Sequence, residues 1–203
     1  QINNMDDFSE GKLWSLAIIA GKESPQWLYD EAEFFVVNSM LGEISIPKYW
    51  DPQVQHRLQE LALALAYEYG DDPRMSLVYL PQMTSNGVEG HFNGVPISTL
   101  EAAGMTPDNW ITAVTSAATS FALALPNKAI AVEVHTLLGD SFIAERIINH
   151  LWDDPALGQR VGAAMWWLSG CLLYPSDAAD EERGVDLGGR RFTKKKQKTT
   201  RGE

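Results

Sequence analysis

Cysteine is almost absent from this chain of 203 residues, in which Cys171 is the only one. A lone cysteine excludes a disulfide framework within the chain, and it excludes structural zinc sites built from several thiolates. No uninterrupted apolar run approaches the roughly 20 residues that a membrane-spanning helix needs, so we expect a soluble body with no membrane partner. Residues 1–9 lack the charged and apolar regions of a signal peptide and do not begin with Met, which favours a truncated amino terminus.

Basic residues are scarce outside residues 171–203, a segment with a different texture from the rest. It runs through Tyr174-Pro175-Ser176-Asp177 and finishes with a lysine-rich stretch from Lys194 to Lys198. It resembles the translated read-through of a sequencing adapter, a contaminant known from metagenomic assemblies. The alternatives are a tail that binds nucleic acid or anionic membranes, and a disordered polar end. We therefore expect a folded domain over residues 1–170 and an artefactual, disordered tail over 171–203.

The shortage of positive charge is clearest when this tail is set aside. Residues 171–203 hold eight of the 16 Lys and Arg but only six of the 27 Asp and Glu, which leaves eight basic and twenty-one acidic residues and a net charge of −13. A body of this charge repels phosphate backbones, and eight scattered cations form no basic patch. Nucleic acid is therefore not expected as a partner.

A glycine-rich phosphate-binding loop is also missing, which disfavours a dinucleotide-binding fold. Four apolar runs have the length of strands and little alternation, as is typical of strands covered on both faces: 13–20, 75–82, 129–135 and 161–167. Helical patterns lie between them at 52–69, 107–125 and 141–152, the first two preceded by Asp51-Pro52 and Thr106-Pro107. This alternation predicts an α/β fold with a parallel sheet, and the polar loop 83–105 favours a barrel with its site at the carboxyl-terminal face.

A series of motifs in order resembles a known family. They are Trp14 to Gly21, Ser24-Pro25-Gln26-Trp27, Ile46 to Pro52 with its Trp50-Asp51-Pro52, and Leu65 to Pro73. Together they are similar to the early strands of glycoside-hydrolase-like (β/α)8 barrels related to the β-galactosidase group. The resemblance spans roughly residues 10–170, and it implies an incomplete TIM barrel of about strands two to six with helices outside.

The resemblance also implies a site. It makes Glu89 the general acid/base of a fragment that acts on a β-linked sugar, with the nucleophile on a later strand beyond residue 170 and the fragment alone inactive. Many retaining enzymes of this type have an asparagine immediately before the acid/base, whereas here Val88 precedes Glu89. Asn86 is the nearest asparagine and therefore the candidate for that amide.

The residues themselves are compatible with this chemistry. Glycoside hydrolysis needs two carboxyl groups, about 5 to 5.5 Å apart for retention and roughly 6.5 to 9.5 Å for inversion, one of which keeps its proton near neutral pH. Glu89 follows a buried strand, and His91 is placed to adjust its protonation or contact a sugar hydroxyl. Glu133 and His135 share one face of a strand and are expected at the barrel mouth. The alternatives are a solvated loop glutamate, a structural ion pair and a core histidine.

No metal and no cofactor are predicted. His91, Glu133 and His135 are permitted metal ligands, but they come from segments without a recognised spacing.

Tryptophan rings offer apolar platforms for sugars, and Trp27 and Trp167 are the candidates for this role, while Trp110 and Trp152 are expected in the core. Two competing hypotheses remain. One is a non-catalytic carbohydrate-binding barrel, and the other is a structural or interaction domain.

Overall fold

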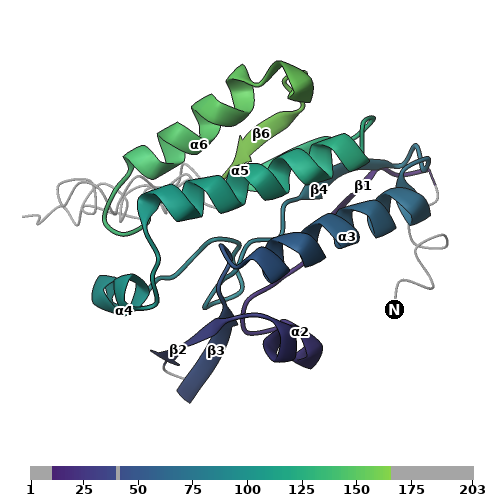
Figure 1. Ribbon diagram of the computed structural model, residues 1–203. Helices are drawn as coiled ribbons and strands as arrows, with labels where there is room; N and C mark the ends of the chain where they lie inside the picture. The colour runs from purple at the N-terminus through teal and green to yellow at the C-terminus, as the bar shows by residue number, and fades with distance from the viewer. Residues whose placement is uncertain (1–10, 40–41, 166–203) are drawn as a thin grey trace, which may run out of the picture. The chain divides into compact units, whose positions relative to one another are not determined.

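The computed structural model describes residues 11–39 and 42–165 (Figure 1). These residues belong to the first of two units into which the chain divides, residues 1–166 and 167–203. The predicted boundary at residue 170, the tail after it and Trp167 lie outside the described residues.

Four strands form a parallel sheet, namely β1 (Trp14–Leu16), β4 (Met75–Tyr79), β5 (Ala129–Glu133) and β6 (Val161–Ala164). Their order in the sheet is β1-β4-β5-β6, which is also their order along the chain. The prediction of an α/β fold with a parallel sheet is therefore confirmed. β1, β4 and β5 are shorter than the apolar runs that predicted them, because the last residues of each run lie in the loop that follows the strand. The end of the run 161–167 lies outside the described residues.

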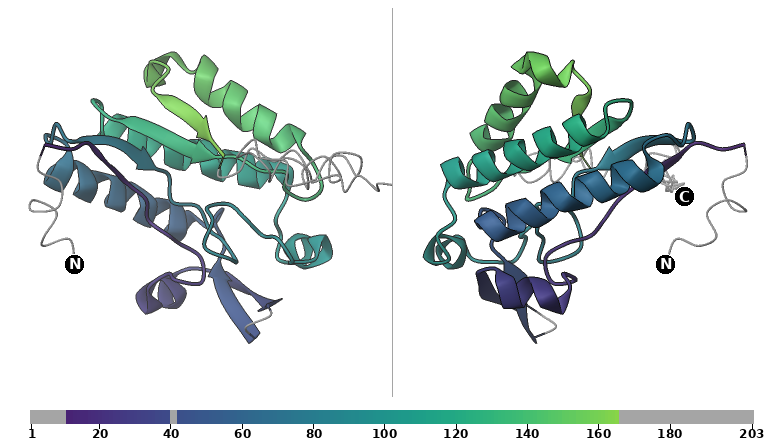
Figure 2. Two further views of the ribbon diagram at one scale, coloured as in Figure 1. Left: turned by 180° about the vertical axis from the view of Figure 1, so that it is seen from behind. Right: turned by 45° about the vertical axis from the view of Figure 1, so that its right-hand side comes forward.

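Three long helices pack on one face of this sheet, as the view from behind shows (Figure 2). They are α3 (Pro52–Tyr69), α5 (Pro107–Ala124) and α6 (Phe142–Asp153), each within one residue of its predicted range. The predicted caps are present: Asp51 Oδ1 accepts a hydrogen bond from the Gln53 amide at 2.7 Å, and Thr106 Oγ1 accepts one from the Asn109 amide at 3.2 Å. Each satisfies an amide that has no partner within the helix.

The other face of the sheet is less covered within the described residues. Val132 and Val161 line a cavity with Ile147 and Leu151 of α6, so they point toward the helices. Because strand side chains alternate, Glu133 lies on the opposite face. The same face carries exposed small residues, namely Ser15, Ala129 and Gly162, beside the buried Ala131 and Glu133. Within the described residues this face is therefore covered only in part, and the expectation of strands covered on both faces holds at Ala131 and Glu133 but not at the exposed positions.

Several elements were not predicted from the sequence. An antiparallel hairpin of β2 (Phe34–Ser39) and β3 (Gly42–Pro47) follows α2 (Gln26–Glu31), and α4 (Ile97–Ala102) interrupts the predicted loop 83–105. A 3-10 turn, η1 (Pro155–Leu157), precedes β6. The Tyr29 hydroxyl of α2 lies 2.9 Å from Gly21 O and 3.0 Å from Ser45 O, so it connects the loop after β1 with the hairpin.

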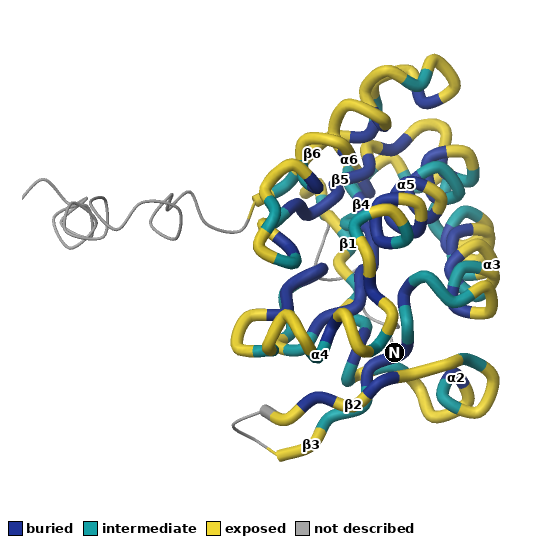
Figure 3. The backbone as a smooth tube through the Cα atoms, turned by 60° about the vertical axis from the view of Figure 1, so that its left-hand side comes forward, coloured by how far each residue is buried: buried dark blue, intermediate teal, exposed yellow. Residues whose placement is uncertain are grey.

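Buried residues are concentrated in β5, at Met75 and Val78 of β4, and on the inner faces of α3 and α5 (Figure 3). Tyr49 is fully buried and donates a hydrogen bond to Pro81 O at 2.8 Å, which fastens the end of the hairpin to the segment after β4. Trp110 is buried as predicted, but Trp152 is 52% exposed because it lies beside the inward-facing row of α6 rather than within it. No helix among the described residues has the length and apolar character needed to cross a bilayer.

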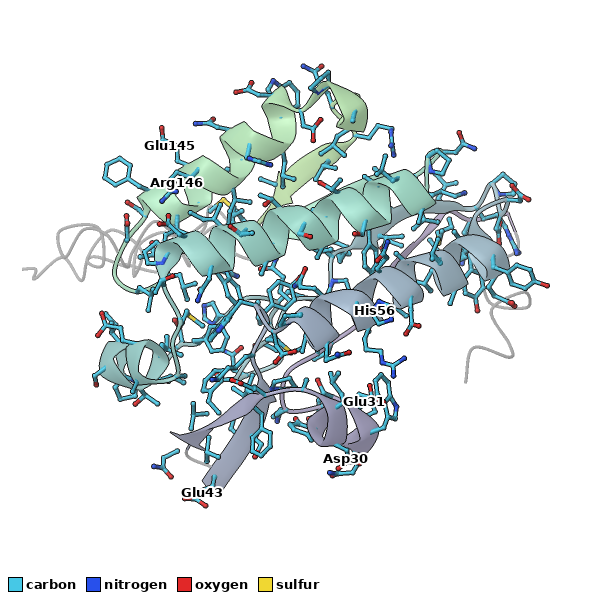
Figure 4. All side chains as sticks on the ribbon, viewed as in Figure 1. Asp30, Glu31, Glu43, His56, Glu145 and Arg146 are labelled. Atoms are coloured by element: carbon cyan, nitrogen blue, oxygen red, sulfur yellow. The ribbon has the colours of Figure 1, made fainter. Side chains whose placement is uncertain are left out.

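Ion pairs link neighbouring helices at the surface. Arg57 of α3 contacts Glu31 of α2 and Glu60 of its own helix, each at 2.6 Å, and Arg146 of α6 contacts Asp108 of α5 at 2.8 Å. Figure 4 labels Glu31 and Arg146 on these helices. Exposed pairs of this kind contribute about 0 to 1 kcal/mol each, so the apolar core dominates the stability of the fold.

Candidate functional site

The segment after β4 stays attached to the neighbouring strand before it turns away. The Leu80 amide donates to Ala131 O at 2.8 Å, and the buried Gln82 side chain donates from Nε2 to Glu133 O at 2.9 Å. These bonds join the carboxyl-terminal ends of β4 and β5. In parallel sheets this is the edge at which functional side chains gather.

Residues 84–91 form a tight loop at this edge. The Ser85 amide donates to His91 O, and the His91 amide donates to Val88 O, both at 3.0 Å. Gly90 has a φ of +71°, and a Cβ atom there would lie 2.6 Å from Gln82 Oε1. Glycine is therefore required at position 90 for both conformation and space.

This loop brings Glu89 against His135, which follows β5. Glu89 is only 2% exposed, and its carbonyl oxygen accepts a hydrogen bond from His135 Nε2 at 2.9 Å. Because a carbonyl can only accept, the proton of a neutral His135 is on Nε2. Glu89 thus lies on the inner side of the loop rather than in solvent.

Glu133 is the second buried carboxyl group at this edge. It is the last residue of β5, its side chain is 1% exposed, and Oε1 lies 3.6 Å from His135 Nε2. Burial lowers the pKa of His135, while the hydrogen bond to the Glu89 carbonyl and the charge of Glu89 act in the opposite direction. Two buried glutamates, one in the loop after β4 and one at the end of β5, therefore lie beside one imidazole.

A second imidazole completes the cluster. The rings of His91 and His135 are 4.7 Å apart between centroids in an edge-to-face arrangement, and Asn86 Nδ2 donates to His91 Nδ1 at 2.7 Å. Burial, and then the proximity of His135, lower the pKa of His91. Both rings line a cavity of about 160 Å³ whose polar wall also includes Asn93 and Thr136.

The structure thus brings together five of the seven predicted site residues, which we call the carboxyl-edge cluster: Asn86, Glu89, His91, Glu133 and His135. Trp27 is not part of this cluster. It is 48% exposed and lines a separate apolar cavity of about 530 Å³ between α2 and α3, where the Arg57 guanidinium lies 5.3 Å from its ring centroid. Trp167 lies outside the described residues.

Sequence reasoning missed the residues that hold the cluster together. Gln82 and Thr84 are buried, and both make hydrogen bonds to residues of the cluster. A polar residue at the end of an apolar run, as at Gln82, is the sequence signal that points to such a role. Within residues 11–39 and 42–165, no group of three or more His, Cys, Asp or Glu is arranged to hold a metal ion.

Comparison with known proteins gives no relative. No family model matches the chain, and no curated protein and no solved structure matches it. The interpretation of the carboxyl-edge cluster therefore depends on its geometry.

Proposed function

We propose that this chain is part of a glycoside-hydrolase-like (β/α)8 barrel that acts on a β-linked sugar, with Glu89 as the general acid/base. The main support is the burial of two carboxyl groups, Glu89 and Glu133, after successive parallel strands and around the same imidazole. Strands that follow one another in the sheet in chain order are the arrangement that such a barrel repeats.

The proposed roles follow from position. Glu89 protonates the oxygen of the leaving group, a step in which a buried carboxylic acid is effective. Glu133 and the two imidazoles bind sugar hydroxyls around it, because carboxylate and imidazole groups donate to or accept from hydroxyl groups. The nucleophile is assigned to a later strand of the barrel, outside the described residues. Trp27 does not belong to this site, since it lines the other cavity.

Because the nucleophile is assigned to a later strand and the fragment alone is expected to be inactive, the test uses the complete barrel protein that contains this chain. It compares that protein with its Glu89→Gln variant on aryl β-glycosides and β-linked disaccharides, with sugar binding followed by calorimetry. For a disaccharide, whose leaving group needs protonation, we expect kcat to fall by about 10² to 10⁴. For a dinitrophenyl glycoside, whose leaving group departs without a proton, the loss is smaller. Glu101→Gln is the matched control, because Glu101 is exposed on α4.

Three results would contradict the proposal. Equal turnover of the parent and Glu89→Gln removes the acid/base role. Saturable binding of a β-linked sugar with no turnover in either form identifies a carbohydrate-binding protein instead. If the protein neither binds nor turns over any of the sugars, the remaining hypothesis is a structural or interaction domain.

A further inference from the structure

The Asn86 side chain has one orientation that its neighbours permit. Its Oδ1 accepts a hydrogen bond from the Val88 amide at 3.1 Å and lies 3.0 Å from the Thr84 hydroxyl. That hydroxyl in turn accepts from the amides of Asn86 and Gly87, both at 3.2 Å. A flipped amide would place its NH2 group against the Val88 N–H, so the oxygen faces the loop and the nitrogen faces His91.

This orientation determines the state of His91. Asn86 Nδ2 is a donor, so His91 Nδ1, 2.7 Å away, must accept with its lone pair. We propose that Asn86 is a positioning residue that holds His91 neutral, with its proton on Nε2. A proton on Nδ1 would face the amide N–H groups across a hydrogen-bonding distance.

The other groups around His91 are consistent with this assignment. From its own loop it faces Asn86, and from the segment after β5 it faces His135, which is bonded to the Glu89 carbonyl and has Glu133 at 3.6 Å. The charge of Glu89 favours a proton on His135, and a proton there opposes a second proton on His91. Burial and His135 both lower the pKa of His91.

If the proposed function holds, the tautomer of His91 determines how this residue contacts a bound sugar. His91 lines the cavity of about 160 Å³ with an imidazole whose Nε2 carries hydrogen. It is therefore a hydrogen-bond donor toward an oxygen of the sugar, and it does not act as a base through that atom. The tautomer itself does not depend on the identity of the ligand.

The experiment is imidazole NMR on the full chain labelled with 15N, in which only four histidines contribute signals and His91→Gln assigns the relevant one. The parent is expected to show a protonated Nε2 and an unprotonated Nδ1, with an apparent pKa below the usual 6.5. Asn86→Asp keeps an oxygen toward Val88 but places a second acceptor against Nδ1. We expect it to protonate Nδ1 and to raise the pKa of His91 by about one unit or more.

Asn93→Asp is the charge control, because Asn93 lines the same cavity and is exposed. It adds the same negative charge without a contact to His91 Nδ1, so the tautomer should stay unchanged. A parent with its proton on Nδ1, or an Asn86→Asp variant with the same tautomer and pKa as the parent, would overturn the inference. If the NMR shows the expected tautomers but the protein binds no sugar, only the proposed function is contradicted. If the protein turns over a sugar but His91 has the other tautomer, only the role of Asn86 is contradicted.

Discussion

At the residue scale, the contact between Gly21 and Thr84 shows how closely the loops of this edge approach one another. A Cβ atom at position 21 would lie 2.2 Å from Thr84 O, and the φ of Gly21 is +88°. Thr84 is also the residue whose hydroxyl fixes Asn86. The backbone of the loop after β1 therefore packs directly against the backbone of Thr84, and so supports the carboxyl-edge cluster.

Replacement of Gly21 by alanine tests this support. Gly87 offers a matched control, since its φ is +94° and a Cβ atom there meets nothing within 4 Å. We expect Gly87→Ala to cost about 1 kcal/mol, from backbone strain alone, and Gly21→Ala to cost about 3 kcal/mol because backbone atoms must also move. Urea denaturation measures both, and equal losses would mean that the close approach is relaxed without cost.

At the scale of elements, the sequence predicted what local chemistry determines. The amino-terminal ends of α3 and α5 follow from a capping residue before a proline, and the four strands of the parallel sheet follow from apolar runs. The β2–β3 hairpin was missed for two reasons. Phe34 and Val36 are apolar although they are exposed, so β2 lacks the apolar–polar alternation of a strand with one solvent face. The connection at residues 40–41 has no Asn-Gly or Asp-Gly signal. The short helix α4 was missed because six residues give too little periodicity to detect.

The candidate site divides in the same way. Glu89 and His91 stand out because they follow a strand, and Glu133 and His135 because charged groups in an apolar run need partners. The pairing of Asn86 with His91 depends on a loop conformation set by Thr84 and two glycines. The position of Trp27 depends on how α2 packs on α3, which no local pattern encodes.

The cap of α3 gives a prediction at this scale. Asp51 accepts hydrogen bonds from the Gln53 amide at 2.7 Å and from the Glu33 amide at 3.1 Å, so it serves the helix and the start of the hairpin together. Asp51→Ala should lower the free energy of unfolding by about 2 kcal/mol, the upper end of the range for a lost N-cap. Asp71→Ala, exposed beyond the end of α3, should change it by less than about 0.5 kcal/mol. Thermal or urea unfolding measures both variants. A similar loss of stability in Asp51→Ala and Asp71→Ala would contradict the role of Asp51 in holding both the helix and the hairpin.

At the scale of the whole molecule, the buried imidazoles make stability depend on pH. The pKa values of His91 and His135 are lowered in the folded state, mainly by burial. The unfolded chain therefore binds more protons than the folded chain once the pH falls below about 6.5. Stability from this source is complete at neutral pH and decreases as the pH falls from about 6.5 toward the folded pKa values.

We therefore expect the free energy of unfolding to decrease between pH 7 and pH 5.5, with a slope of at most about 1.4 kcal/mol per pH unit for each histidine. The double variant His91→Gln/His135→Gln should flatten this slope. His150→Gln, exposed on α6, should leave it as in the parent. The slope rather than the absolute stability is the measured quantity, and an unchanged slope in the double variant would assign the effect to other groups.

The hydrogen bonds that hold Asn86 also bear on the chemical stability of its side-chain amide, that is, on deamidation. Asn86 is followed by Gly87, a pair in which the backbone nitrogen of the glycine can attack the side-chain amide, release ammonia and leave aspartate or isoaspartate after hydrolysis. Here the Gly87 N–H is bound to Thr84, and the Asn86 amide is held at both its oxygen and its nitrogen. We therefore expect this reaction to be slower in the folded loop than in the unfolded chain, and its aspartate product to place a negative charge beside His91.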